Sequence, residues 1–177
     1  QRRKVHPVMW GHDVPQPDRR KDAFTILHAG TYKILAARPW IYETSNEFVS
    51  GLQKLIKSVQ SINNTRLVIK VREEHYECSL KTLRSLLPDS GTWELKASGS
   101  FIDELLKSDL LISFSSTTIE ESLFARRPVG LFGGSDRYRH LPGSDQAPTL
   151  KCRSAVYHLS KHNLSEMLNQ IVKVHKN

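Results

Sequence analysis

The stretch from Ser108 to Gly134 constrains the fold more strongly than any other part of this sequence. Residues 110–114 form a short apolar run, which is typical of a strand buried on both faces of a sheet. A second apolar run follows at residues 128–132 and ends at two glycines. Between the two runs stand four successive hydroxyl residues, Ser115, Ser116, Thr117 and Thr118. The pattern predicts two buried strands, with a polar turn after the first.

The residues after this turn predict a helix. Thr117 with Glu120, and likewise Thr118 with Glu121, fit the Ser/Thr-x-x-Glu capping box that opens helices. The helix cannot continue beyond residue 127, because a proline follows, which lacks an amide hydrogen and clashes with the preceding turn. The whole stretch is therefore predicted to be strand, turn, helix and strand.

The same alternation extends over the rest of the chain from residue 23. Strands are predicted at 23–31, 66–72, 92–95 and 154–159, and helices at 46–62, 79–87, after 97 and at 163–174. Alternating strands and helices predict an α/β fold, a Rossmann-like doubly wound parallel sheet of about six strands with helices on both faces. Right-handed crossovers would place the loops after Gly30, Ala97, Phe114 and Phe132 at one edge of the sheet.

The first 22 residues differ from the remainder in composition. Their prolines and polar residues predict a linker or N-terminal extension, and residues 23–177 are expected to form one domain. No apolar run approaches the roughly 20 residues that span a membrane, and no signal peptide is recognisable. Because the sequence does not start with Met, we expect it to be one half of a larger protein.

The chain is basic, with a formal net charge of +8 and a pI of about 9.6. Such a charge is compatible with three kinds of partner: a nucleic acid, an anionic membrane surface or a small anionic ligand. No nucleic-acid-binding motif is present, so a nucleic acid is not expected as a partner. The two cysteines, Cys78 and Cys152, lack metal-binding spacing, so no metal site is expected. They are expected to be reduced thiols, with a disulfide between them as the alternative.

A phosphate site is predicted where the helix after Thr118 begins. Hydroxyls and unpaired amides at a helix N-terminus, placed at the carboxyl end of a parallel strand, attract phosphate. Gly30, after the first strand, would let a ligand phosphate approach the backbone closely. An ordinary capped helix and an ordinary turn glycine are the alternatives to these two interpretations.

The segment SSTTIEESLFARRPVGLF, residues 115–132, resembles the nucleotide-binding half of the GT-B glycosyltransferases. In that family a helix carrying a glutamate precedes a Pro-Val strand start, and the glutamate holds the donor ribose. The resemblance implies this role for Glu121, while Glu120 is expected to cap the helix. Arg126 and Arg127 depart from the small residue and glycine usual before the proline.

The resemblance also implies the remaining parts of a donor site. Residues 97–113 are similar to the family's base-binding region, which implies main-chain contacts of the base with Ser100, Phe101 and Ile102. Gly30 and Thr31 correspond to the loop near the donor phosphates. In the polar loop that follows Gly134, four residues are candidates for the sugar or the diphosphate, against the alternative of a plain surface loop: Asp136, Arg137, Arg139 and His140.

The function implied is that of a donor-binding domain, which holds a nucleotide-sugar, UDP- or GDP-linked, for transfer to a surface polysaccharide, glycan or lipid-linked acceptor. The family needs no metal at the diphosphate, and the acceptor and catalytic base come from an N-terminal domain, so the isolated half should be inactive. The expected location is the cytoplasm, with peripheral attachment to the inner face of the membrane left open. Half of a nucleotide-sugar 2-epimerase and a non-catalytic polyanion-binding module are the alternatives.

Overall fold

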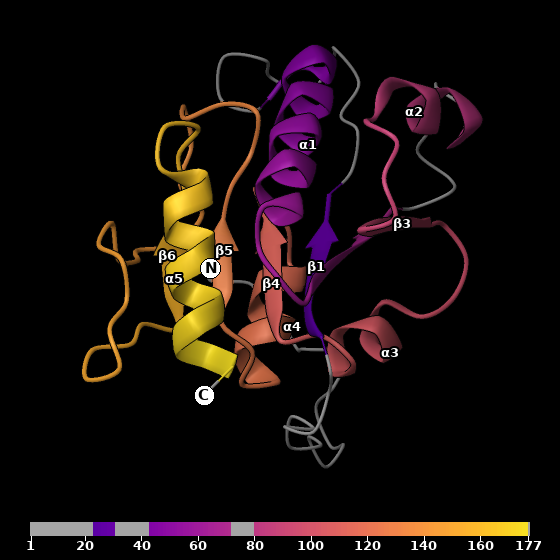
Figure 1. The fold of residues 1–177 in the computed structure, drawn as a ribbon. Helices are drawn as coiled ribbons and strands as arrows, with labels where there is room; N and C mark the ends of the chain where they lie inside the picture. The colour runs from indigo at the N-terminus through magenta and orange to yellow at the C-terminus, as the bar shows by residue number, and fades with distance from the viewer. Residues whose placement is uncertain (1–22, 31–42, 72–79, 177) are drawn as a thin grey trace, which may run out of the picture.

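The computed structural model describes residues 23–30, 43–71 and 80–176. This part of the chain contains six strands and five helices (Figure 1). In chain order they are β1 (Phe24–Ala29), α1 (Ser45–Gln60), β2 (Thr65–Lys70), α2 (Leu80–Leu86), β3 (Trp93–Lys96), α3 (Phe101–Leu106), β4 (Leu110–Ser113), α4 (Thr118–Phe124), β5 (Val129–Leu131), β6 (Val156–His158) and α5 (Leu164–Lys176). The predicted linker 1–22, Thr31 and Cys78 lie outside the described residues, and Cys152 is an exposed free thiol.

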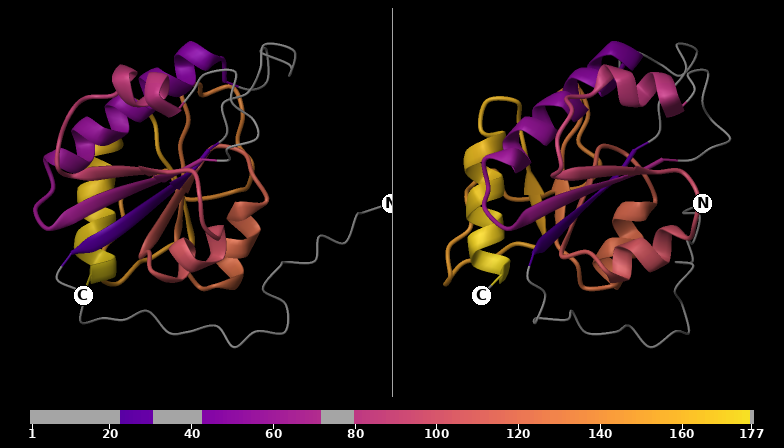
Figure 2. Two further views of the ribbon diagram at one scale, coloured as in Figure 1. Left: turned by 90° about the vertical axis from the view of Figure 1, so that its right-hand side faces the viewer. Right: turned by 45° about the vertical axis from the view of Figure 1, so that its right-hand side comes forward.

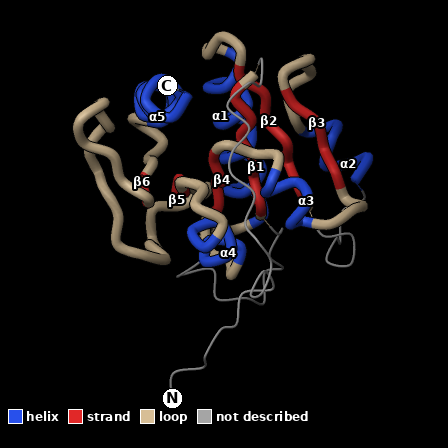
Figure 3. The backbone as a smooth tube through the Cα atoms, turned by 90° about the horizontal axis from the view of Figure 1, so that it is seen from below, coloured by secondary structure: helices blue, strands red, loops and turns tan. Residues whose placement is uncertain are grey.

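The six strands form one sheet in the order β3-β2-β1-β4-β5-β6, and every neighbouring pair is parallel. β1 pairs with β2 on one side, where Ile26 faces Leu67, and with β4 on the other, where Ile26 faces Leu110. The carboxyl ends of all six strands therefore lie at one edge of the sheet. Figure 3 shows the six strands side by side in this order. This confirms the predicted doubly wound parallel sheet of about six strands.

Helices cover both faces of the sheet (Figure 2). One core lies between the sheet and α1, α2 and α5, and includes Phe48, Leu83 and Leu168. The second core lies on the opposite face, where Leu105 of α3 and Ile119 of α4 pack on the strands. None of the described helices is both long and apolar enough to cross a membrane.

The helix α1 shows how the local sequence determines an element. Its buried apolar residues recur at spacings of three and four, as the sequence predicts, and form one face: Phe48, Leu52, Leu55, Ile56 and Val59. A capping box starts the helix, since the Thr44 side chain accepts from the Glu47 amide at 3.3 Å and the Glu47 carboxylate accepts from the Thr44 amide at 2.8 Å.

The start of α4 differs from the prediction. Thr117 is the N-cap residue but makes no side-chain capping hydrogen bond, because its backbone is helical (φ −63°, ψ −13°) rather than extended. Ser116 Oγ instead accepts from the Thr118 amide at 3.3 Å. Glu120 does not cap the helix, since its Oε1 lies 2.9 Å from Nε2 of His140. The two capping boxes expected from the sequence are therefore wrong.

The end of α4 comes three residues earlier than the limit set by Pro128. Arg126 adopts a left-handed conformation (φ 56°), and its amide donates to the carbonyl of Leu123 at 3.0 Å. The amide of Arg127 donates to the carbonyl of Ser122 at 2.9 Å, which completes a Schellman motif. Arg126 therefore occupies a position that glycine usually fills.

Arg127 has a structural role. Its side chain is 2% exposed, and its guanidinium donates to three carbonyls, those of Ser108 at 2.9 Å, Leu106 at 3.1 Å and Ala125 at 3.3 Å. Burial lowers the pKa of the Arg127 guanidinium, and the nearby Asp109 carboxylate opposes that shift. Arg127 thereby ties the end of α4 to the turn between α3 and β4.

Candidate functional site

The strand order reverses between β1 and β4, because the chain leaves β1 toward β2 and leaves β4 toward β5. Open α/β sheets bind their ligands in the crevice that such a reversal creates outside the carboxyl ends of the strands. A small cavity of about 30 Å³ lies here. Its lining includes three residues that the sequence predicts for the phosphate site, Gly30, Ser115 and Ser116.

Several polar groups at this point of the sheet have no partner within the described residues. Ser113 Oγ is fully buried and Thr118 Oγ1 is nearly so, and neither makes a hydrogen bond there. The amides of residues 115–117 likewise find no acceptor within the described parts of the chain. Successive unpaired amides next to buried hydroxyls are groups that can bind an anion.

The other predicted site residues that the structure describes are not part of the lining of this cavity. Thr117 is exposed, and Glu121 is half-buried in the first turn of α4. Ser100 caps α3, because its hydroxyl accepts from the Asp103 amide at 3.5 Å, while the side chains of Phe101 and Ile102 pack against the second core. The loop before α3 follows β3, two strands from β1, so these three residues do not line the cavity.

The loop before Ser100 is shaped by a buried cation. Lys70 at the end of β2 is 9% exposed, and its ammonium group donates to the carbonyls of Ala97 at 2.6 Å and Ser98 at 3.1 Å. These bonds fix the main chain at the point where the sequence predicts contacts with a nucleotide base. The contacts themselves remain a prediction.

Glu43 also lines the cavity, and sequence reasoning missed it. It is 7% exposed, and its Oε2 accepts from the amide of Gly134 at 2.6 Å. A side chain at Gly133 would collide with the ring of Phe114, and one at Gly134 with the backbone of Glu47, so the two glycines let this loop pack tightly. No local signal marks Glu43, because the glycine it binds lies 91 residues away.

His28, at the end of β1, is packed in the core. It is 5% exposed, and its ring lies 6.0 Å from that of Phe48. Burial lowers its pKa from 6.5 to about 4, so the imidazole is neutral near pH 7. A side chain at Gly30 would meet this ring at 2.6 Å, so Gly30 leaves room for His28 as well as for a ligand.

Three of the other candidate side chains, in the loop after Gly134, contact charged or polar partners: Arg137, Arg139 and His140. Arg137 makes a bidentate pair with Glu47 at 2.6 and 2.8 Å, which lowers the pKa of that carboxyl to about 2. His140 pairs with Glu120 at 2.9 Å.

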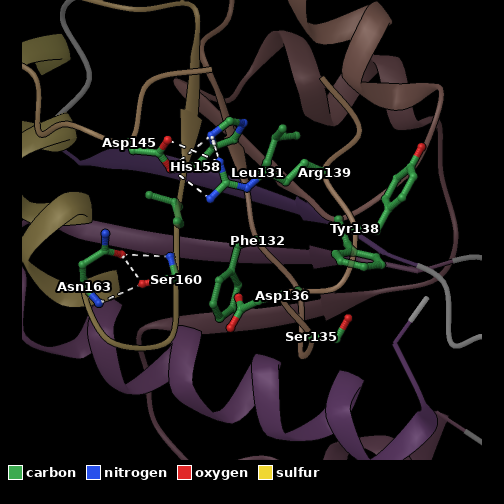
Figure 4. Close-up of a pocket in the computed structure, with 13 residues that line it drawn as sticks. Leu131, Phe132, Ser135, Asp136, Tyr138, Arg139, Asp145, His158, Ser160 and Asn163 are labelled. Carbon is green, nitrogen blue, oxygen red and sulfur yellow. Dashed lines mark hydrogen bonds and ion pairs between the residues drawn. The ribbon is translucent and has the colours of Figure 1, made fainter. Parts of the chain in front are cut away.

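Arg139 makes its contacts on the other side of this loop. It lies 3.2 Å from Asp145 and 3.1 Å from Nδ1 of His158 (Figure 4). These residues belong to the wall of a second, larger pocket, which also includes Phe114 of the first cavity.

No protein-family model matches the sequence, and no curated protein is significantly similar to it. Solved structures do share its fold. A putative UDP-N-acetylglucosamine 2-epimerase from Listeria monocytogenes matches 99% of this chain and 42% of its own, with a TM-score of 0.55 and 17% identity. The glycotransferase of kitacinnamycin matches 98% of this chain and 39% of its own, with a TM-score of 0.50 and 12% identity.

A third similar structure is the H444N variant of the wall teichoic acid polymerase TagF, with a TM-score of 0.50 and 16% identity over 92% of this chain. The match covers 37% of the polymerase, so the chain spans less than half the length of each of these three proteins. At such identities the likeness shows the fold, which is the GT-B type of α/β fold that the resemblance implies.

Proposed function

We propose that this chain is the nucleotide-sugar-binding half of a glycosyltransferase, which acts together with an acceptor-binding half. One observation supports this most strongly. Two kinds of polar group lie close to Gly30, where the strand order reverses: the buried hydroxyl of Ser113 and the amides of residues 115–117. None of these groups has a hydrogen-bond partner within the described residues.

In this proposal the diphosphate binds at Gly30, Thr31 and the turn of residues 115–118. Amides and hydroxyls bind its oxygens and stabilise the negative charge that develops on the leaving nucleotide, so no metal is needed. Since α4 has only seven residues and lacks the expected caps, the helix dipole contributes less than these direct donors.

The nucleoside extends from the diphosphate in two steps. Glu121, in the first turn of α4, accepts hydrogen bonds from the ribose hydroxyls. The base lies along the main chain at Ser100, Phe101 and Ile102. The acceptor, a glycan or a lipid-linked saccharide, and the catalytic base belong to the other half, so this half alone binds donor without transferring sugar.

Isothermal titration of the chain with UDP, GDP and CDP tests the proposal. We expect one nucleotide to bind with a dissociation constant below about 1 mM, and Glu121→Gln to weaken it about tenfold through loss of a charged hydrogen-bond acceptor. Glu166→Gln is the matched control, because Glu166 is an exposed carboxylate in the first turn of α5.

Two results would contradict this proposal in different ways. If none of the three nucleotides binds, the nucleotide site is wrong. If Glu121→Gln binds the preferred nucleotide as tightly as the parent chain, the site stands and the ribose role of Glu121 is wrong.

A further inference from the structure

The edge of the sheet at which β5 and β6 begin carries exposed cations and exposed apolar side chains. α4 connects β4 to β5, and α5 follows β6, so both helices start at the carboxyl edge and end at this amino edge (Figure 1). The segments that precede β5 and β6 lie here too. Together they form a surface that we call the basic face, with four cations and two apolar residues: Arg126, Lys151, Arg153, Lys176, Phe124 and Leu150.

Leu150 and Lys151 form the tip of a tight turn. The residues on either side of them are joined through their backbones: the Thr149 amide donates to the Cys152 carbonyl at 3.0 Å, and the Cys152 amide to the Thr149 carbonyl at 3.2 Å. Turns usually carry glycine, proline or short polar residues at such positions, yet Leu150 is 66% exposed. The turn therefore holds an aliphatic side chain out in solvent.

Hydrogen bonds connect the base of this turn to the end of α5. The Ser154 amide donates to the hydroxyl of Tyr157 at 3.0 Å, and this hydroxyl lies 2.9 Å from Nε2 of His175 in the last turn of α5. Burial, and to a smaller extent the charge of Arg153, lowers the pKa of His175. Arg153 is therefore close to the end of α5, and the turn and the helix belong to one surface.

The turn after α4 lies beside the same segment. Val129 of β5 and Val156 of β6 are paired in the sheet, and Arg126 and Arg153 each lie three residues before them. The Val129 amide also donates to the carbonyl of residue 155 at 2.8 Å, so the pairing extends toward the two arginines. Arg126 and Arg153 therefore belong to neighbouring segments of the basic face.

The cations of the basic face are not neutralised by the described carboxylates. None of the four makes an ion pair with a described residue. The carboxylates of α4 and α5 lie in the first turns, at the opposite edge: Glu120, Glu121 and Glu166. A helix dipole explains a cation at Lys176, but the other three cations lie outside the helices. The face is thus electropositive beyond what capping of α5 requires.

The combination of apolar and cationic groups indicates the surface of a bilayer with anionic lipids. An aliphatic side chain at such a surface gains free energy by entering the boundary between headgroups and acyl chains, while cations are attracted to the anionic headgroups. Single-stranded nucleic acid is instead bound by aromatic side chains that stack on bases, and Leu150 cannot do this. Leu150 and Lys151, adjacent in one exposed tip, meet both requirements of a lipid surface.

We propose that the basic face binds an anionic lipid bilayer, with Leu150 inserted among the headgroups and the four cations close to lipid phosphates. Phe124, which is 39% exposed at the end of α4, lies at the level of the headgroups. The cavity between β1 and β4 lies at the other edge of the sheet and stays accessible. Binding requires no nucleotide, so the proposal is independent of the proposed function.

Cosedimentation with lipid vesicles, without nucleotide, tests the proposal. The vesicles consist of phosphatidylcholine alone or of phosphatidylcholine and phosphatidylglycerol in equal parts. We expect binding to the mixed vesicles that is at least about tenfold stronger than to the neutral ones. The double variant Arg126→Gln, Arg153→Gln should weaken this binding about 25-fold, because each cation near an anionic surface contributes about fivefold. Leu150→Ser should weaken it at least about threefold.

Matched controls remove the same groups elsewhere. Lys54→Gln with Lys81→Gln removes two charges from exposed positions of α1 and α2, and Leu86→Ser removes an exposed leucine beside β3, at the other end of the sheet from β6. Both should bind the mixed vesicles within about twofold of the parent, because exposed charges beyond a Debye length are screened.

Three results would overturn the proposal. The first is that the parent chain does not bind the mixed vesicles. The second is that the control variants lose as much binding as the variants of the basic face, since net charge alone would then explain the attraction. The third is that Leu150→Ser binds vesicles like the parent while the double arginine variant loses affinity for a single-stranded oligonucleotide, since the face would then serve a nucleic acid.

Discussion

At Arg126 and at His28, the folded structure imposes a free-energy cost on a single residue. A side chain other than glycine in the left-handed region is strained by its Cβ, and Arg126 accepts this strain at the end of α4. Protonation of a histidine in the core is disfavoured because burial desolvates the charged imidazolium, and His28 is in this position. Both costs can be measured.

Arg126→Gly should stabilise the chain. Glycine adopts φ 56° without a Cβ clash, and we expect a gain of about 1 kcal/mol, which raises the melting temperature by roughly 2–4 °C. Arg126→Ala removes the same charge but keeps the Cβ, so it should leave the melting temperature nearly unchanged. Equal effects of the two variants in a thermal melt would show that charge, not backbone strain, dominates at this position.

The stability of the chain should fall as the pH falls from 6.5 to about 4 because of His28. Its folded pKa, about 4, lies below the unfolded value of 6.5, so the unfolded chain takes up more protons in this range. The stabilisation is complete above pH 6.5, and the loss reaches about 3 kcal/mol once the pH is below both values. Urea unfolding as a function of pH measures it.

His28→Gln should flatten this part of the profile, because glutamine does not titrate. His162→Gln, at an exposed position, should leave the profile as it is. A parent chain whose unfolding free energy stays constant between pH 6.5 and 4 would contradict a buried neutral His28.

At the scale of the elements, α4 depends on its neighbours more than on its own sequence. It has seven residues, and a helix this short is unstable alone in water. The buried guanidinium of Arg127 connects its end to the turn before β4, while the pair between Glu120 and His140 connects its start to the loop after β5. The turn of residues 115–118 is therefore positioned by contacts on both sides of α4.

Arg127→Ala should destabilise the chain by about 3 kcal/mol, because three carbonyls lose a charged donor and a cavity forms. Arg127→Lys should recover only part of this loss, since an ammonium group lacks the forked donors that reach three carbonyls at once. Urea denaturation gives both values. If Arg127→Lys is as stable as the parent, the charge alone matters and the planar geometry does not.

The sequence predicts the elements well where their signal is local. The spacing of Phe48, Leu52 and Leu55 predicts α1, and the apolar runs predict the strands that form the sheet. The Ser-Thr turn and Gly30 come together as expected because parallel strands end at one edge.

The contacts that shape the site are different, because their partners are distant in sequence. Glu43 binds the amide of Gly134, and Glu120 binds His140 rather than capping α4. Propensity and capping patterns describe only neighbours along the chain, so tertiary pairing overrode the capping boxes expected at Thr117 and Thr118. The second pocket, with Arg139 in its wall, depends on such pairings as well, and no sequence pattern predicts it.

At the scale of the whole molecule, the net charge of +8 gives the chain a general attraction for polyanions, which must be separated from specific nucleotide binding. Three of the basic groups near the candidate site already have partners within the chain: Arg127 is buried on carbonyls, and Arg137 and Arg139 pair with carboxylates. Donor recognition through amides and hydroxyls at residues 115–118 involves few charges. The two kinds of binding should therefore differ in their dependence on salt.

Raising NaCl from 50 to 200 mM should weaken binding of the preferred nucleotide less than tenfold, because few ion pairs are screened. Binding of a single-stranded 20-mer oligonucleotide, if it uses six or more phosphate contacts, should fall by about 10³-fold or more over the same range. Parallel titrations at both salt concentrations measure the two slopes. Equal slopes, together with equal affinity for UDP, GDP, CDP and pyrophosphate, would mean that the basic surface as a whole binds the ligand. The cavity between β1 and β4 would then have no role as a nucleotide site, because a built site must distinguish its nucleotide from other anions of the same charge.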